Sequence, residues 1–350
     1  MNNESTTRTG SVASTDDTSG TNLRGDRPVR RRRRRRRLVI ALSLIAVVVL
    51  AAVIAVRSPS PVGHWENSAG HDRYLAAYDD ALADLPAPDR VSDVRTEYGL
   101  VRVYRFNGSG PATDPLVLLP GRASASPVWA DNLPSLLDVG DVYTIDLLGE
   151  PGRSIQERPI TDDHDQAEWL DQTLDALPES QFHLVGLSIG GWTATNLALR
   201  VPDRINTLTL LDPVSVFDDM PLETIVRSLP ASLPWLPKSW RDGFNSYTAG
   251  GAPVEDVPVA DMIEAGMQHY SLKLPQPTRI RESQLAELTV PVLALLAGES
   301  VMLDATRAAE TAERELPDAR VEVYPNASHA ISGEYPDEIA ADIAEFLAER

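Results

Sequence analysis

The residues best suited to chemistry are a serine between glycines, in the stretch Gly186-Leu187-Ser188-Ile189-Gly190. Residues 182–185 before it are mostly apolar and predict a buried strand, whereas residues 192–200 after it predict a helix. Gly186 and Gly190 allow a sharp strand-to-helix turn, in which a side chain would collide with its neighbours. The turn would expose the Ser188 hydroxyl, which could attack an electrophile if a base accepted its proton.

A histidine is the usual base for such a serine, and the chain contains only six histidines. Four of them fall near the amino-terminal side, in a polar loop or in a long insertion, and His183 lies inside the strand before Ser188, where a packed core residue is expected. His329 instead follows a predicted strand over residues 320–324. We therefore expect His329 at the same sheet edge as Ser188, as the general base.

The elements that position these residues alternate along the chain, which predicts the α/β class: a mostly parallel sheet with helices on both faces. Strands are predicted at residues 95–106, 116–119, 141–147, 182–185, 207–211, 290–296 and 320–324, and helices at 165–177, 192–200, 304–316 and 336–347. Residues 214–287 are too long for an ordinary connection and contain several prolines and aromatics. They predict a helical cap over the carboxyl ends of the strands.

Composition and charge exclude several kinds of chemical site and argue against one class of binding partner. The 350-residue chain has no cysteine, which excludes disulfides, thiolate metal sites and a cysteine nucleophile. Residues 1–57 hold 12 arginines and 4 acidic residues, net +8, and residues 58–350 hold 20 basic and 47 acidic residues, net −27, which together give −19. Because nucleic acid is itself negatively charged, the strong negative charge of residues 58–350 argues against nucleic acid as a partner.

The amino-terminal segment has the pattern of a membrane anchor. Residues 1–37 predict a disordered tail that ends in eight consecutive arginines, and residues 38–56 contain no charge. Nineteen helical residues span about 28 Å, close to a bilayer's hydrocarbon thickness. The arginines predict a cytoplasmic amino terminus and an extracytoplasmic main domain in the cell membrane. A cleaved signal peptide, with secretion, is the alternative. Residues 57–71 predict a linker, and residues 72–350 the folded domain.

From about residue 95 to residue 347, the order of elements resembles the α/β-hydrolase family, and within it the esterase-like and lipase-like serine hydrolases. The resemblance is carried by the turn at Ser188 and the loop Asn326-Ala327-Ser328-His329-Ala330. It implies an α/β-hydrolase fold and acyl transfer to Ser188, because relatives that use an aspartate nucleophile differ at this position.

The third catalytic residue implied by the resemblance is a carboxylate that orients His329. Many relatives carry it in a Gly-x-x-Asp pattern after the next-to-last strand, but here the third residue after Gly298 is Val301. Asp212, in Leu211-Asp212-Pro213, is similar to the Leu-Asp-Pro of lipases that place the acid one strand earlier, and Pro213 ends the strand ladder. Asp304 is the alternative acid, although it also suits a helix N-cap. Glu299 is a third candidate.

The resemblance also implies an oxyanion hole built from the backbone N–H groups of Ile189 and Arg122. No cofactor or metal is expected, and the predicted substrate is a small-molecule or lipid ester, reached by a membrane-anchored serine hydrolase. The same triad could serve thioester, peptide, carbon–carbon or peroxide chemistry. The alternative outside the enzymes is a binding protein that keeps this fold but has no catalytic activity. The sequence does not determine the oligomeric state.

Overall fold

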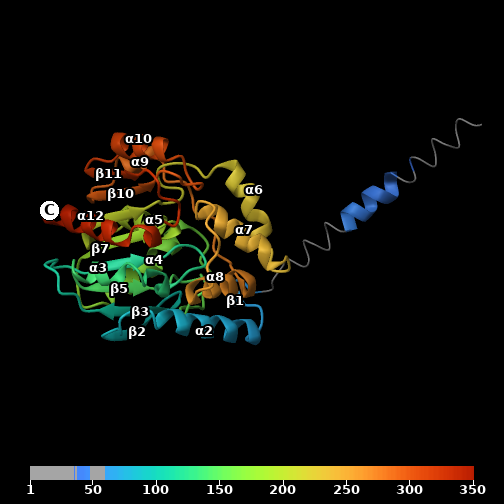
Figure 1. The fold of residues 1–350 in the computed structure, drawn as a ribbon, viewed down its shortest axis with the longest axis horizontal. Helices are drawn as coiled ribbons and strands as arrows, with labels where there is room; N and C mark the ends of the chain where they lie inside the picture. Colours follow the sequence, from blue (N-terminus) through green and yellow to red (C-terminus); the bar gives the residue numbers. More distant parts are fainter. Residues whose placement is uncertain (1–34, 36–37, 48–59) are drawn as a thin grey trace, which may run out of the picture. The chain divides into compact units, whose positions relative to one another are not determined.

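The computed structural model describes residues 35, 38–47 and 60–350 (Figure 1). The chain divides into two units, Met1–Pro59 and Ser60–Arg350, and the second contains the sheet and both hydrophobic cores. Residues 38–47 of the first unit are helical. No helix among the described residues is long and apolar enough to cross a membrane. Residues 48–56 of the predicted span lie outside the described residues, as do most of the tail and residues 57–59 of the predicted linker.

In the part of the chain that the structure describes, nine strands form one mixed, mostly parallel sheet in the order β11-β10-β8-β7-β4-β5-β3-β2, with β6 paired to β3. Parallel pairing runs from β11 through β5, and the pairs that involve β3 are antiparallel. The strands are β2 (Arg90–Thr96), β3 (Gly99–Phe106), β4 (Leu116–Leu119), β5 (Val142–Ile145), β6 (Ile155–Gln156), β7 (Phe182–Leu187), β8 (Ile205–Leu211), β10 (Val292–Ala297) and β11 (Ala319–Tyr324).

Helices cover both faces of this sheet, as predicted (Figure 1). Alternate residues of the central strands point to opposite faces, so Val117 of β4 belongs to one hydrophobic core and Leu118 to the other. The first core packs against α4 (Asp163–Asp175), α5 (Ile189–Ala198) and α10 (Ala305–Glu315). The second packs against α2 (Ser68–Leu82), η1 (Ser126–Trp129), α3 (Leu133–Leu137), α8 (Pro258–His269) and α12 (Pro336–Ala348). Two further short elements are η2 (Pro202–Arg204) and α11 (Ile331–Glu334).

Two local predictions differ from the structure. The strand predicted over residues 95–106 is a hairpin of β2 and β3, because the chain turns at Glu97 and Tyr98. The linker predicted over residues 57–71 belongs to the compact unit from Ser60 onward. There β1 (His64–Trp65) pairs with β9 (Tyr270–Ser271), and the Asn67 side chain accepts the Gly70 N–H to cap α2. An asparagine at position 67 is the sequence feature from which the start of this helix could have been predicted.

The insertion after β8 forms helices, as the sequence predicts. It contains α6 (Leu222–Ala231), α7 (Lys238–Thr248), α8, β9 and α9 (Glu282–Leu285). A buried ion pair joins α7 to α8: the Arg241 guanidinium donates to both oxygens of Glu264 at 2.7–3.0 Å. A pair removed from water in this way stabilises one arrangement of the two helices, because either charge alone would be buried without a partner.

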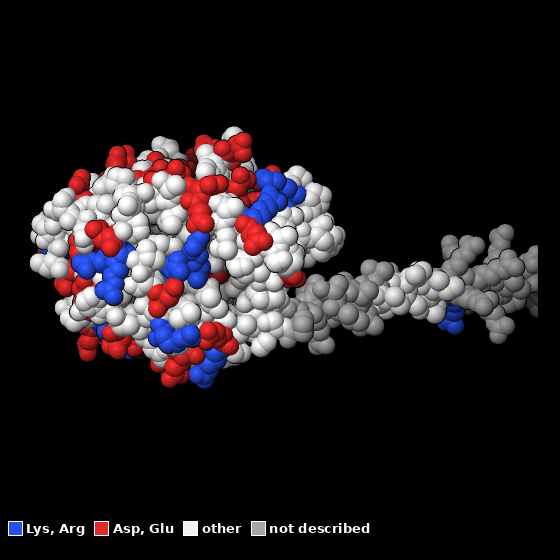
Figure 2. All heavy atoms as spheres, turned by 90° about the horizontal axis from the view of Figure 1, so that it is seen from below, with Lys and Arg blue, Asp and Glu red and all other residues white. Residues whose placement is uncertain are grey.

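Figure 2 shows the charge distribution on one face of the molecule. Acidic side chains are spread over much of that face, in keeping with the net charge of the main unit. The margin at the right, the side on which α6 and α7 lie in Figure 1, is mostly uncharged. The charge on this face is therefore not uniformly distributed.

Candidate active site

The tight turn between β7 and α5 presents Ser188 at the carboxyl end of the central strand. Ser188 has φ 55° and ψ −117°, a conformation that a non-glycine residue rarely adopts. A Cβ at Gly186 would lie 2.5 Å from the Gly190 oxygen, and one at Gly190 would lie 2.1 Å from the Leu119 oxygen. The carbonyl oxygen of Ser188 accepts the Gly191 and Val214 N–H groups at 3.1 and 3.3 Å, which holds the turn in place. Gly186 is therefore required by the close approach of the strand end to the start of α5, and Gly190 by the packing of the turn on β4.

Three side chains form a hydrogen-bonded line from this turn. His329 Nε2 lies 2.9 Å from Ser188 Oγ, and His329 Nδ1 lies 2.6 Å from Asp212 Oδ2. Asp212 is fully buried, whereas Ser188 keeps 6% of its surface exposed. An ionised carboxylate only accepts hydrogen bonds, so the arrangement assigns the proton to Nδ1 and leaves Nε2 free to accept from the serine hydroxyl. This is the geometry that activates a serine.

The Asp212 carboxylate is held by donors besides His329. Its Oδ1 accepts the Ala297 N–H at 3.1 Å, and its Oδ2 accepts the Ser300 hydroxyl at 2.6 Å. The Asp212 backbone also adopts a positive φ of 41°, which turns the chain away from β8 directly after the strand. These contacts fix the orientation of the carboxylate toward His329. Sequence reasoning did not find the part played by Ser300.

The other two candidate acids lie elsewhere. Asp304 caps α10, where its Oδ1 accepts the Arg307 N–H at 3.1 Å. Glu299 has an exposed side chain, and its backbone N–H donates to the Ala327 oxygen at 2.9 Å. The structure thus brings Asp212 to His329 and uses Asp304 as the helix cap.

The loop that carries His329 is bound on both sides. The Ser328 N–H and hydroxyl donate to Glu334 at 2.8 and 2.6 Å, which anchors the loop to α11. The His329 N–H donates to the oxygen of Thr248, the last residue of α7, at 3.1 Å. The imidazole is therefore positioned partly by the insertion, which no pattern in the sequence indicated.

The two residues predicted for the oxyanion hole, Ile189 and Arg122, line one small cavity beside the serine. The loop after β4 reaches the serine closely, since a Cβ at Gly121 would lie 3.6 Å from Ser188 Cβ. The Arg122 guanidinium lies 3.3 Å from buried Glu150, whose other oxygen accepts the Ala123 N–H at 3.1 Å. Glu150 thus holds the side chain of one residue and the backbone of the next, which fixes the loop. The sequence placed Glu150 only in a loop.

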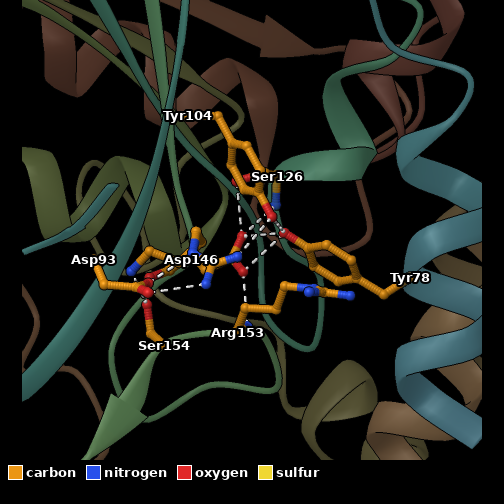
Figure 3. Close-up of polar contacts among 8 residues, drawn as sticks. Tyr78, Asp93, Tyr104, Ser126, Asp146, Arg153 and Ser154 are labelled. Carbon is orange, nitrogen blue, oxygen red and sulfur yellow. Dashed lines mark hydrogen bonds and ion pairs between the residues drawn. The ribbon is translucent and has the colours of Figure 1, made fainter. Parts of the chain in front are cut away.

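Another buried carboxylate, Asp146, follows β5 at the same edge of the sheet (Figure 3). Its Oδ1 accepts the Ser126 N–H and hydroxyl at 2.9 and 2.7 Å. Its Oδ2 accepts the Tyr78 hydroxyl at 3.0 Å and the Arg153 N–H at 2.8 Å. Burial, reinforced by Asp146, raises the pKa of Tyr78 well above its usual range, so this hydroxyl stays protonated and keeps donating. Asp146 therefore ties α2, η1 and the loop after β5 to the sheet.

Comparisons with known proteins agree with this description. A family profile described as the alpha/beta hydrolase fold matches residues 114–251. The carboxylesterase YbfK of Bacillus subtilis is 26% identical over 287 residues, which are 79% of this chain and 93% of that protein. A protein named uncharacterized carboxylesterase nap, from the same organism, is 27% identical over 283 residues, 79% of this chain and 92% of that one.

The solved structures give the same result. The crystal structure of naproxen esterase from Bacillus subtilis superimposes with a TM-score of 0.72 at 26% identity, covering 79% of this chain and 98% of that one. The chain belongs to the α/β-hydrolase family and is an enzyme, a serine hydrolase of the α/β-hydrolase type.

Proposed function

We propose that this enzyme hydrolyses carboxylic esters through an acyl-enzyme on Ser188. The observation that carries the proposal is the line of hydrogen bonds from Ser188 Oγ through His329 to Asp212. Two of the relatives are named carboxylesterases, which favours ester substrates over the other chemistries open to this triad.

In the proposed reaction, Ser188 Oγ attacks the ester carbonyl carbon while His329 Nε2 accepts the hydroxyl proton. The negative charge that develops on the carbonyl oxygen is stabilised by the N–H groups of Ile189 and Arg122. Collapse of the tetrahedral intermediate breaks the bond to the alcohol oxygen, which takes the proton from His329. Water then attacks the acyl-enzyme by the same route and releases the acid. Asp212 stabilises the protonated imidazole of His329 during both acylation and deacylation.

The walls of the small cavity indicate what such an ester would look like. Eight of the twelve lining residues are apolar, including Leu148, Trp192 and Leu274, and the other four are Arg122, Glu150, Gln166 and Thr193. A mostly apolar wall that includes Ile189, the residue after the nucleophile, favours an uncharged hydrocarbon group on one side of the ester. We therefore propose apolar small-molecule or lipid esters as the substrate class.

We also propose that residues 38–56 anchor the enzyme in the cell membrane, with residues 60–350 on the extracytoplasmic side. Residues 38–47 are helical, and their large apolar side chains are 53–64% exposed. A helix that is apolar on every side is suited to hydrocarbon surroundings. The eight arginines before it favour a cytoplasmic amino terminus. Fractionation of cells tests this: release by alkaline carbonate would contradict a spanning anchor.

The assignment of Ser188 predicts a large loss in a single variant. Ser188→Ala should lower kcat/KM for p-nitrophenyl butyrate by about 10⁴-fold or more, because no nucleophile remains. It should also abolish labelling by a fluorophosphonate probe. The exposed Ser180→Ala variant is the control, and its rate and labelling should match the parent protein. Labelling that persists in Ser188→Ala would overturn the proposed function.

A further inference from the structure

Helix α6 of the insertion has its apolar face turned to solvent. Four large side chains at helical spacing are exposed: Leu222 at 74%, Ile225 at 43%, Val226 at 56% and Leu229 at 57%. The inward positions are the small residues Thr224 and Ala231, with exposures of 0% and 2%. This is the reverse of a helix that packs its apolar stripe on a core. An outward stripe of this kind marks an interaction surface.

Two tryptophans of the segment that follows α6 are also exposed. Trp235, in the connection to α7, is 75% exposed, and Trp240, within α7, is 53% exposed. Tryptophan is enriched where proteins meet the headgroup region of a bilayer, because its ring is apolar while its N–H can hydrogen-bond. We refer to Leu222, Ile225, Val226, Leu229, Trp235 and Trp240 as the apolar cap surface.

The amino-terminal entry to the folded unit lies on the side of the insertion. Shortly after Ser60, β1 pairs with β9, which directly follows α8, and α8 in turn contacts α7. Only residues 57–59 separate the uncharged segment from Ser60. The Cα atoms of Val56 and Ser60 can be at most about 14 Å apart along a fully extended chain. If residues 38–56 span a bilayer, the insertion therefore cannot lie far from its surface.

Charge favours the same contact. Apart from Arg241, which is buried against Glu264, residues 222–248 contain two basic and two acidic side chains, whereas residues 58–350 as a whole carry a net charge of −27. Anionic headgroups repel an acidic surface, and the repulsion weakens where the local charge is near zero or positive. The mostly uncharged margin in Figure 2 lies on the side of α6 and α7.

We propose that the apolar cap surface docks on the bilayer leaflet next to the anchor, an inference that rests on the anchor proposed above. Docking covers exposed apolar area, as in helices that lie in the membrane interface. It also brings the catalytic histidine close to the bilayer, because the Thr248 oxygen at the end of α7 accepts the His329 N–H. The substrates are then esters dissolved in the bilayer, which enter from the lipid.

The absence of cysteine makes a site-specific test possible in the full-length chain. Leu229→Cys and Val91→Cys are labelled with an environment-sensitive fluorophore and reconstituted in vesicles of phosphatidylcholine and phosphatidylglycerol. Val91 is the matched control, because it is 49% exposed on β2, the edge strand at the other end of the sheet from β11. Lipids with nitroxide-labelled acyl chains should quench the probe at position 229 by about twofold or more and leave the probe at position 91 unaffected.

Flotation of the same vesicles separates the two proposals. Protein that floats and resists carbonate, but whose probe at position 229 is quenched no more than that at position 91, would overturn docking and leave the anchor standing. Protein that does not float would overturn the anchor and docking together. Self-quenching that grows with protein density, without lipid quenching, would show that a second copy covers the surface and would also overturn docking. Hydrolysis of a soluble ester in each preparation reports on the triad separately.

Discussion

Replacing Asp212 by Asn is expected to lower kcat by about 10⁴-fold while KM changes little. The reason lies in the other partners of the carboxylate. The Ala297 N–H can only donate, so the Asn oxygen must stay at the Oδ1 position. The amide NH₂ then faces His329 Nδ1 and places the proton on Nε2. In that tautomer the histidine cannot accept the Ser188 proton. Steady-state kinetics with a p-nitrophenyl ester measures the loss.

Asp304→Asn is the matched control for this variant. Asparagine caps a helix about as well as aspartate, so α10 should remain intact and kcat should stay within about twofold of the parent value. The free energy of unfolding should also be similar for both variants, because Asn tolerates the positive φ of position 212. Equal losses of kcat in the two variants would contradict the assignment of Asp212.

Asp146→Ala is expected to reduce the free energy of unfolding by about 4 kcal/mol, since it leaves several buried donors without an acceptor. The Ser126 N–H and hydroxyl, the Tyr78 hydroxyl and the Arg153 N–H all donate to this one carboxylate (Figure 3). Alanine leaves the space of the carboxylate empty and accepts none of these hydrogen bonds. Bulk water cannot replace them, because the site is fully buried. Urea unfolding followed by circular dichroism gives the difference.

The control for Asp146 is a nearby aspartate that pairs with the side chain of the same arginine at the surface. Asp79 pairs with the Arg153 guanidinium, but its side chain is 60% exposed, so Asp79→Ala should cost less than about 1 kcal/mol. Asp146→Ala should also lower the activity, because residues just after Asp146, including Leu147 and Glu150, line the small cavity. A loss in Asp146→Ala no larger than that in Asp79→Ala would mean that the buried carboxylate contributes little to stability.

The sheet and the position of the triad follow from local features of the sequence. Short apolar runs such as residues 116–119 and 182–185 lie in strands; Ser188 and Asp212 come directly after strands, and His329 lies in the loop after β11. Because parallel strands end at one edge, Ser188, Asp212 and His329 could be assigned to a common edge without coordinates. The choice between Asp212 and Asp304 was harder, since both follow strands. The carboxylate of Asp304 could either orient the histidine or cap the helix that follows it. In the structure it caps α10.

What sequence reasoning missed depends on contacts between distant residues. Ser300 meets Asp212 across 88 positions and Tyr78 meets Asp146 across 68, and neither spacing produces a periodic pattern. The stretch around Trp65 reads as a linker by its prolines and glycines, yet Trp65 packs on Tyr74 and Tyr270 at 4.6 and 5.0 Å between ring centroids. Its order comes from aromatic partners that only the folded chain supplies.

The hydrogen bond from the His329 N–H to the Thr248 oxygen limits how the parts of this enzyme can be exchanged. Ser188 and Asp212 follow neighbouring strands, β7 and β8, and belong to the framework of the sheet. The loop of His329 is shared between that framework and the insertion. A chimera that replaces the insertion with that of a relative must therefore preserve the end of α7, or transfer residues 326–334 with it, so that the N–H of the histidine still meets a carbonyl acceptor.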